Sequence, residues 1–289
     1  MYVFIAPMLL LFVLFTLYPV FGSFRYTLYD WNGIGEPRRY VGITNFFDTF
    51  RDPWFWNAFK NTLIYTLVLV PIQLAIALVM AVILDRPWLR ARYVYRAAFI
   101  APIVTSSAIV GIIITLLVTT ANRGVNQLVL NFGLLTRPFD WLGDARTAMP
   151  ILIGTGIWIG LGYPIIYFLA ALQSIDKQLY DAAKVDGAGI WASFRHVTVP
   201  QILPVGVVVA LLVALSSLRV FDIVQVMTKG GPYFATDVVS TYVYRYTFAT
   251  DLADPNVGRA SAAAFLVSLL IGAVTVLEVG MIRRIRAQK

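Results

Sequence analysis

The chain of 289 residues is too apolar to fold as an ordinary soluble protein. Hydrophobic residues make up 59% of it and charged residues 13%, and its mean hydropathy is +0.76, a composition typical of a chain buried in lipid. The net charge of +8 does not predict nucleic-acid binding, because the basic residues cluster at the ends of apolar segments. The absence of cysteine excludes disulfides, thiolate catalysis and cysteine metal sites.

Six apolar segments are long enough to cross a bilayer as helices, which takes about 20 residues each. In chain order they cover residues 2–24, 61–84, 97–120, 149–172, 204–227 and 260–282. The first has neither the basic start nor the small-residue cleavage site of a signal peptide, so we expect it to remain as an anchor. The sequence therefore predicts an all-α integral membrane protein, a single transmembrane domain over residues 1–289 with both termini on one side.

The third span, residues 97–120, contains three consecutive hydroxyl residues, Thr105, Ser106 and Ser107. Polar groups inside a span are unfavourable unless they line a cavity, so these three are candidates for a solute pathway. Such hydroxyls also bond back to carbonyls of their own helix, and this alternative stays open.

The fourth span, residues 149–172, contains Gly160, Gly162 and Pro164, which predict a kink or a break. Tyr163 and Tyr167 lie one turn apart beside it. Gly162 and the two tyrosines are further pathway candidates, although glycine in a span also serves close helix packing.

The segment 173–203 is predicted to fold as two short helices. Ser174 or Asp176 can accept hydrogen bonds from the first turn of one helix, and Gly187 supplies its left-handed stop. A second helix fits residues 189–197, and Pro200 is expected to end it before the fifth span.

The first of these two helices offers a partner protein a shallow apolar strip, because Leu179, Ala182 and Ala183 share one face. The alternative is a helix lying on the lipid surface. Such a helix favours Lys and Arg, whereas this one presents acidic side chains, including Asp181 and Asp186. We therefore expect 173–203 to be a docking element.

The fifth span, residues 204–227, carries Ser216, Ser217, Arg219 and Asp222. Arg219 and Asp222 are three residues apart and could pair on one helical face. The serines and Arg219 are candidates for the pathway, with snorkelling of Arg219 to the interface as the alternative.

Lys and Arg density predicts which side faces the cytoplasm. Four arginines lie between Asp85 and Arg96, the tail after residue 282 adds four basic residues, and 173–203 adds three. The other side spreads as many over about twice the length. We expect both termini and the segment 173–203 to be cytoplasmic.

The sequence contains no recognisable catalytic motif. None of the five lysines follows a glycine, so the P-loop pattern is absent and ATP must be bound elsewhere. The single histidine, His196, has no serine or carboxylate at a catalytic spacing, so we interpret it as a surface or packing residue. The chain is not expected to be an enzyme.

One motif resembles the EAA loop of ABC importer permeases, in which Glu-Ala-Ala is followed by three residues, Gly, nine residues and Ile-x-Leu-Pro. The chain has Asp181-Ala182-Ala183, Gly187 and Val197-x-Val199-Pro200 at the same spacing. Elsewhere the chain resembles the sugar-permease branch of this family, and its Gly-Gly-Pro loop resembles the maltose and glycerol-3-phosphate type first permease. The motifs for this are Asn61-Thr62, Phe221-Asp222-x-Val224, Thr228-x-Gly230-Gly231-Pro232, Thr236 and Tyr242-x-Tyr244.

This resemblance implies a type I importer permease fold in a bacterial or archaeal plasma membrane. It implies a second permease subunit, two ATP-binding subunits that hold ATP and Mg, and an external solute-binding protein as partners beside membrane lipid, with no cofactor in this chain. It also implies that coupling to the ATPase rests on Asp181, Ala182, Ala183, Asp186 and Gly187.

The function that follows is import of a sugar or sugar-like solute. A non-sugar solute stays an alternative. A secondary transporter would need inverted repeats and acids at the membrane midplane, and neither is evident: the spans contain only Asp222 and Glu278, each near an end.

Overall fold

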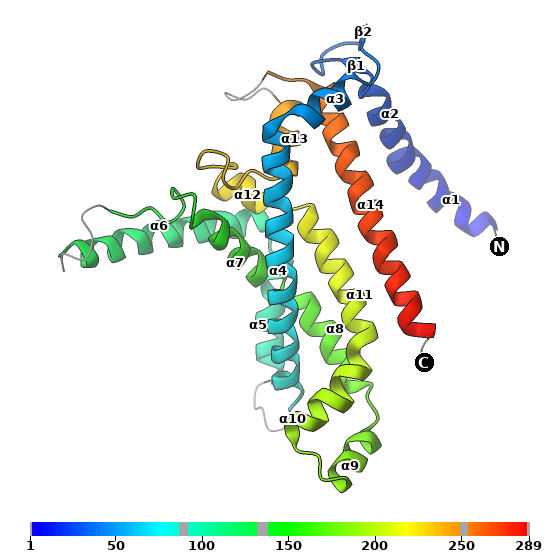
Figure 1. Cartoon of the computed structure of the whole chain (residues 1–289), viewed down its shortest axis with the longest axis vertical. Helices are drawn as coiled ribbons and strands as arrows, with labels where there is room; N and C mark the ends of the chain where they lie inside the picture. Colours follow the sequence, from blue (N-terminus) through cyan, green and yellow to red (C-terminus); the bar gives the residue numbers. More distant parts are fainter. Residues whose placement is uncertain (1, 87–91, 132–137, 249–253, 288–289) are drawn as a thin grey trace.

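The computed structural model describes residues 2–86, 92–131, 138–248 and 254–287, and most of them are helical (Figure 1). The elements are α1 (Tyr2–Phe12), the π-helical turn η1 (Val13–Leu17), α2 (Tyr18–Tyr26), β1 (Tyr29–Asp30), β2 (Arg39–Tyr40), α3 (Thr44–Arg51), α4 (Pro53–Asp85), α5 (Arg92–Val104), α6 (Ser107–Asn131), α7 (Ala148–Gly160), α8 (Gly162–Gln173), α9 (Lys177–Val185), α10 (Ile190–Ser193), the π-helical turn η2 (Phe194–Thr198), α11 (Val199–Leu218), α12 (Asp222–Met227), α13 (Val239–Thr247) and α14 (Val257–Ala287). The two short strands pair antiparallel.

The centre of the molecule is α4, with α8 and α11 packed along it. Asp52 caps the start of α4 by accepting from the Trp54 amide at 2.9 Å. Small side chains let the helices approach closely, since Ala77 and Ala81 of α4 are fully buried in the same apolar cluster as Leu152 of α7. By contrast, α6 projects sideways from the bundle, and α1 and α2 splay away from it (Figure 1).

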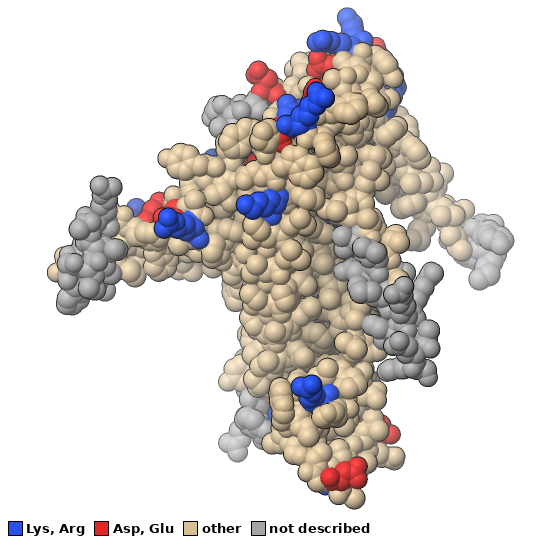
Figure 2. Space-filling model, viewed as in Figure 1, with Lys and Arg blue, Asp and Glu red and all other residues tan. Residues whose placement is uncertain are grey.

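Among the described residues, four helical stretches are long and apolar enough to cross a membrane: Ile5–Tyr26, Pro53–Asp85, Ser107–Gln127 and Ile190–Met227. The pair α7 and α8, bent by 47°, makes a fifth. The searched apolar part of α14, Val257–Ala273, is shorter, and the side chain of Glu278 lies outside the described residues. On the face in Figure 2 a broad uncharged band separates the charged ends of the central bundle, as a lipid-embedded protein requires.

The predicted third span is not one continuous helix. It is divided into α5 and α6, and the break falls at Thr105 and Ser106. Pro102 has no amide hydrogen for the helical ladder, and the Thr105 amide bonds three residues back to the Pro102 carbonyl at 3.3 Å. Ser106 then begins the new helix by accepting from the Val110 amide at 3.0 Å. The prediction of a single helix over 97–120 was wrong here.

The break predicted in the fourth span is confirmed: α7 ends at Gly160 and α8 begins at Gly162. The fifth span extends to Met227, but it is not one continuous helix, because α11 ends at Leu218 and α12 begins at Asp222. Arg219 follows the end of α11 and Asp222 starts α12. They therefore do not share a helical face, and no ion pair joins these two described residues.

Pro200 does not end the second loop helix, contrary to the prediction. The chain is helical from Ile190 through α10, η2 and α11 to Leu218. A proline in a helix clashes with the carbonyl four residues earlier, which for Pro200 is that of His196, inside the wider turn η2. The first helical stretch has the same arrangement, with Pro19 placed four residues after Phe15 of η1. We attribute the continuity of both helices to these π-helical turns.

Candidate solute cavity and coupling helix

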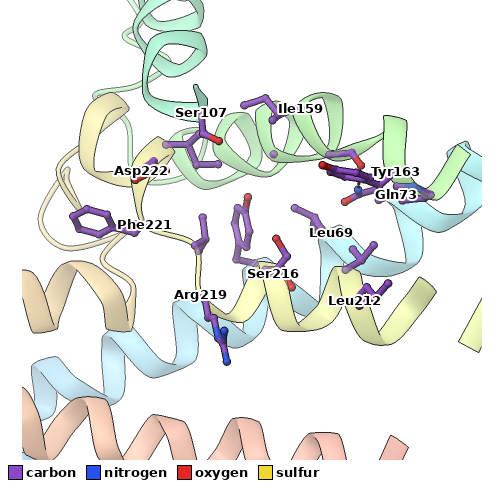
Figure 3. A pocket seen from close by; sticks show the side chains of 18 of the residues that line it. Leu69, Gln73, Ser107, Ile159, Tyr163, Leu212, Ser216, Arg219, Phe221 and Asp222 are labelled. Carbon is purple, nitrogen blue, oxygen red and sulfur yellow. Dashed lines mark hydrogen bonds between the residues drawn. The ribbon is translucent and has the colours of Figure 1, made fainter. Parts of the chain in front are cut away.

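A cavity of about 480 Å³ lies between α4, α7, α8 and α11, close to the breaks in the fourth and fifth spans (Figure 3). This volume is within the usual range of small-molecule sites. Aliphatic side chains such as Leu69, Ile159 and Leu212 form part of its wall. The polar and aromatic lining residues are Tyr65, Gln73, Ser107, Tyr163, Tyr167, Ser216, Ser217, Arg219, Phe221 and Asp222.

The cavity has a closed side and an open side. On the closed side Tyr65, Gln73 and Ser217 are buried, and the Ser217 hydroxyl donates to the Ala214 carbonyl at 2.9 Å. On the open side Tyr163 is 59% exposed, and Arg219 is exposed as well. In Figure 3 the Arg219 side chain points away from Asp222 and from the serine on α11.

Six of the nine predicted pathway residues line this cavity: Ser107, Tyr163, Tyr167, Ser216, Ser217 and Arg219. Thr105 and Ser106 instead occupy the break between α5 and α6, and the Thr105 hydroxyl bonds back to the Ala101 carbonyl at 3.3 Å. Gly162 faces α5, where a side chain would collide with Ile103 and with the Phe99 carbonyl. It serves close packing of α8 on α5.

Tyr65 and Gln73 of α4 also line the cavity, although they were not among the predicted pathway residues. The sequence pattern could have identified these two residues. They belong to a series of positions spaced four residues apart, and this spacing places side chains on one face of a helix. The repeated positions are Asn57, Asn61, Tyr65, Leu69, Gln73, Ala77 and Ala81, and all but Asn57 are buried.

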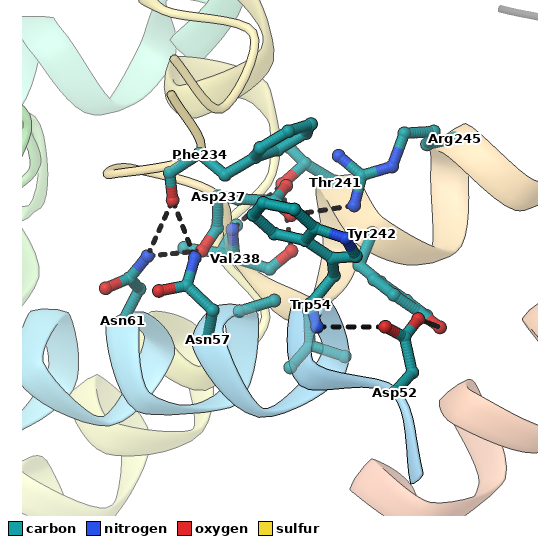
Figure 4. Close-up of polar contacts among 12 residues, drawn as sticks. Asp52, Trp54, Asn57, Asn61, Phe234, Asp237, Val238, Thr241, Tyr242 and Arg245 are labelled. Carbon is teal, nitrogen blue, oxygen red and sulfur yellow. Dashed lines mark hydrogen bonds and ion pairs between the residues drawn. The ribbon is translucent and has the colours of Figure 1, made fainter. Parts of the chain in front are cut away.

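The beginning of the same helix holds the Gly-Gly-Pro loop in place (Figure 4). Asn57 donates to the Phe234 carbonyl at 2.7 Å. Asn61 donates to the Phe234 carbonyl at 3.2 Å and to the Asp237 carbonyl at 3.0 Å. Four polar contacts with high sequence separation therefore fix this loop to α4, once the 3.0 Å bond from the Val239 amide to the Thr62 hydroxyl is included.

A buried ion pair lies next to these contacts. The Asp237 carboxylate is fully buried and accepts from Arg245 at 2.9 Å and from the Thr241 hydroxyl at 2.7 Å. The Arg245 side chain, 9% exposed, also lies over the Phe234 ring. Burial raises the pKa of Asp237 above its ordinary value, and Arg245 and Thr241 oppose the rise. Burying these two charges carries a desolvation penalty, so the stability of this region depends on the presence of both partners.

A second carboxylate, Asp52, joins three helices at this end. Besides capping α4, it accepts from the Tyr242 hydroxyl of α13 at 2.7 Å and from Arg259 of α14. Burial and the bond to Asp52 raise the pKa of Tyr242, so its hydroxyl stays protonated as the donor.

The helix α9, with α10, forms the far end of the molecule from α3 and α13 (Figure 1). Of the two predicted caps, Asp176 is the one that accepts, from the Gln178 amide at 2.9 Å. Gly187 has a φ of +76°, and the Ala188 amide returns to the Ala183 carbonyl at 2.9 Å, so the left-handed stop is confirmed.

Around α9 the surface is open and partly apolar. Asp181, Ala182, Asp186 and Gly187 are exposed and Ala183 is half-buried, and Val185 beside them is 88% exposed. A 2.9 Å bond between the hydroxyls of Tyr180 and Thr198 ties α9 to η2. His196 is exposed and its Nδ1 lies 3.0 Å from the Ala192 carbonyl.

The family model described as "Binding-protein-dependent transport system inner membrane component" matches residues 50–287. The chain belongs to this family. It is therefore a multi-pass permease of the inner membrane, a transport subunit and not an enzyme, and membership excludes the secondary-transporter alternative.

The permease is similar over nearly its full length to permease proteins of sugar transport systems. It is 32% identical over 279 residues to the lactose transport system permease protein LacF of Rhizobium radiobacter, covering 96% of this chain and 92% of the relative. It is 30% identical over 281 residues to the multiple sugar-binding transport system permease protein MsmF of Streptococcus mutans, covering 97% and 94%. A chain in the crystal structure of a bacterial ABC transporter that imports the acidic polysaccharide alginate matches with a TM-score of 0.81, 25% identity, and coverage of 98% and 94%.

Proposed function

We propose that the permease moves a sugar or sugar-like solute from an external binding protein into the cytoplasm, driven by ATP hydrolysis on separate subunits. The cavity of about 480 Å³ is the observation that carries this proposal. Tyrosine rings offer flat apolar faces to a sugar, while serine and glutamine side chains offer donors and acceptors for its hydroxyls. The similarity to LacF and MsmF supports a sugar over other solutes.

The open side of the cavity faces a second permease subunit in this proposal. Ser216, Arg219 and Asp222 line the cavity and are exposed in the single chain. Polar and charged side chains at membrane depth do not face lipid. A second subunit covering this side would enclose a solute pathway between the two permeases.

The termini and α9 lie on the cytoplasmic side, with six crossings in total. The crossings are α1 with α2, α4, α5 with α6, α7 with α8, α11 with α12, and α14. Positive charge near the tail and the segment 173–203 supports this orientation. Asp181, Ala182, Ala183, Asp186 and Gly187 then contact one of two ATPase subunits, which bind ATP and Mg.

Substitution of Arg219 by methionine is expected to lower solute uptake about tenfold, since it removes a charged donor worth roughly 1.5–3 kcal/mol to a bound partner. The measurement is uptake by vesicles containing the assembled importer. Thr119→Val is the matched control, because the Thr119 hydroxyl only bonds back to carbonyls of α6 and uptake should not change. Unaltered uptake by the Arg219 variant would remove this residue from the pathway.

The solute class is tested by purifying the cognate binding protein and identifying by mass spectrometry what it retains. A mono- or oligosaccharide is the expected result. An amino acid, a polyamine or inorganic phosphate would overturn the sugar assignment and leave the permease family unchanged.

A further inference from the structure

Two polar side chains of α4 reach the closed side of the cavity and keep hydrogen-bonding groups that are not paired within the described part of the protein. Tyr65 and Gln73 are each 2% exposed and both line the cavity. They lie eight residues apart on one face of α4, with Leu69 between them. Buried polar groups are normally paired within the protein, so the partners of these two side chains are informative.

The Gln73 carboxamide is held by one bond, from its Nε2 to the Gly160 carbonyl at 2.7 Å. Because a carbonyl only accepts, the amide nitrogen must occupy that position and the Gln73 oxygen must point elsewhere. No other described residue bonds to that oxygen or to the second N–H. The oxygen is not sealed in the protein interior. In Figure 3 Gln73 lies beside Tyr163 at one end of the cavity.

The Tyr65 hydroxyl has no hydrogen-bond partner among the described residues, yet it is not sealed inside the protein either. It passes over Gly156 of α7, where an added Cβ would overlap the hydroxyl oxygen. Gly160, one turn further along α7, leaves room for Gln73 in the same way, since a Cβ at Gly160 would lie 2.6 Å from the Gln73 Nε2. Two glycines one turn apart thus leave room for the two polar groups.

We infer that Tyr65 and Gln73 bind hydroxyl groups of the transported solute and determine its specificity. This rests on the proposed function, and it adds α4 to the elements that recognise the sugar. Eight residues of helix separate the two Cα atoms by about 12 Å, with an apolar leucine between them. The polar ends of the two side chains lie closer together than that, because they pass over Gly156 and Gly160, which are one turn of α7 apart. Neighbouring hydroxyl groups of one sugar therefore fit the pair.

The test is uptake by vesicles containing the complete importer with its binding protein. The probes are radiolabelled lactose, maltose, cellobiose and raffinose beside glucose and galactose. The unchanged importer is expected to take up at least one of these six sugars. Gln73→Leu and Tyr65→Phe should each reduce the uptake of that sugar about tenfold. The sugar concentration that gives the half-maximal rate should change more than the maximal rate does.

Monodeoxy derivatives of the transported sugar separate recognition from a merely structural role. The unchanged importer should take up one derivative about tenfold more slowly than the parent sugar. Gln73→Leu should take up this derivative as fast as the parent, because the missing hydroxyl and the missing carboxamide are the two partners of one hydrogen bond. A second derivative should behave in this way with Tyr65→Phe. A structural defect would instead slow the parent and all derivatives by one factor.

Glycine substitutions provide an independent variant and its control. Gly160→Ala is expected to displace the Gln73 amide and slow uptake about tenfold. Gly154→Ala on the same helix should leave uptake unchanged, since a Cβ at Gly154 meets nothing within 4 Å.

Each contrary outcome has a distinct meaning. If the unchanged importer takes up none of the six sugars and its binding protein retains no sugar, the proposed function fails and the inference fails with it. If it takes up one of them and neither Gln73→Leu nor Tyr65→Phe slows that uptake, the inference fails and the proposed function stands. The same holds if every derivative is slowed equally in Gln73→Leu and in Tyr65→Phe.

Discussion

Replacing Gly187 with valine is expected to reduce solute uptake at least tenfold while ATP hydrolysis is no longer stimulated by the loaded binding protein. Gly187 ends α9 with a φ of +76°, and a left-handed conformation costs an ordinary residue about 1–2 kcal/mol, more when the side chain is β-branched. An added Cβ would meet no atom within 4 Å, so the effect comes from the backbone alone. The end of α9 should therefore change shape without a steric clash.

Gly187→Asn is the matched control. Asparagine tolerates the left-handed region far better than valine, so this variant should keep most of the uptake and most of the stimulation. The measurements are vesicle uptake and ATPase rate on the same preparation, after membrane insertion has been checked. Normal coupling in the valine variant would contradict the assignment of α9 as the contact with the ATPase.

Replacing Arg245 with methionine is expected to lower the stability of the permease by about 3–5 kcal/mol, the usual effect of leaving one charge of a buried pair without its partner. The group left without its partner is Asp237, which is fully buried and, among the described residues, retains only the Thr241 hydroxyl as a side-chain donor. The loop held by Asn57 and Asn61 would loosen with it. The measurement is the midpoint of thermal unfolding of the purified importer in detergent.

This loss should depend on pH in a defined direction. Arg245 opposes the rise in the pKa of Asp237 that burial causes, so its removal raises that pKa further. A carboxyl whose pKa is higher in the folded protein than in the unfolded one favours folding when it is protonated. The variant should therefore recover stability as the pH is lowered through the folded-state pKa of Asp237 and lose it again as the pH rises.

A double variant separates the charge effect from lost packing. Arg245→Met combined with Asp237→Leu removes both charges, and it should be more stable than the Arg245 variant alone because no charge is left buried. If the double variant is less stable than the single one, packing of Arg245 on the Phe234 ring, and not the ion pair, dominates.

Much of the helical architecture could be predicted from hydropathy, because long apolar runs form helices in lipid whatever their tertiary contacts. The break at Leu161 was also predictable, since glycine and proline act locally. The break at Thr105 was missed although Pro102 precedes it, because hydropathy does not report helical continuity.

The candidate site was less predictable. Hydroxyl and aromatic residues such as Ser216 and Tyr163 were found because they stand out within apolar spans. Gln73 stands out equally, but its meaning depends on Gly160, 87 residues away, and a pairing of that kind is fixed by tertiary packing. Likewise, the spacing of Arg219 and Asp222 predicted a pair on one helical face, but α11 ends at Leu218 and a new helix begins at Asp222.

The π-helical turns η1 and η2 affect how relatives should be aligned with this chain. Each holds one residue more than a plain α-helical turn, and one residue is about 100° of rotation. A helical wheel drawn from Ile190 to Leu218 without a rotation of about 100° at η2 would place the residues on one side of η2 on the wrong helical face. A relative with an uninterrupted α-helix here should show a one-residue gap close to residues 194–198, and the side chains that follow would keep their orientation only if that gap is respected.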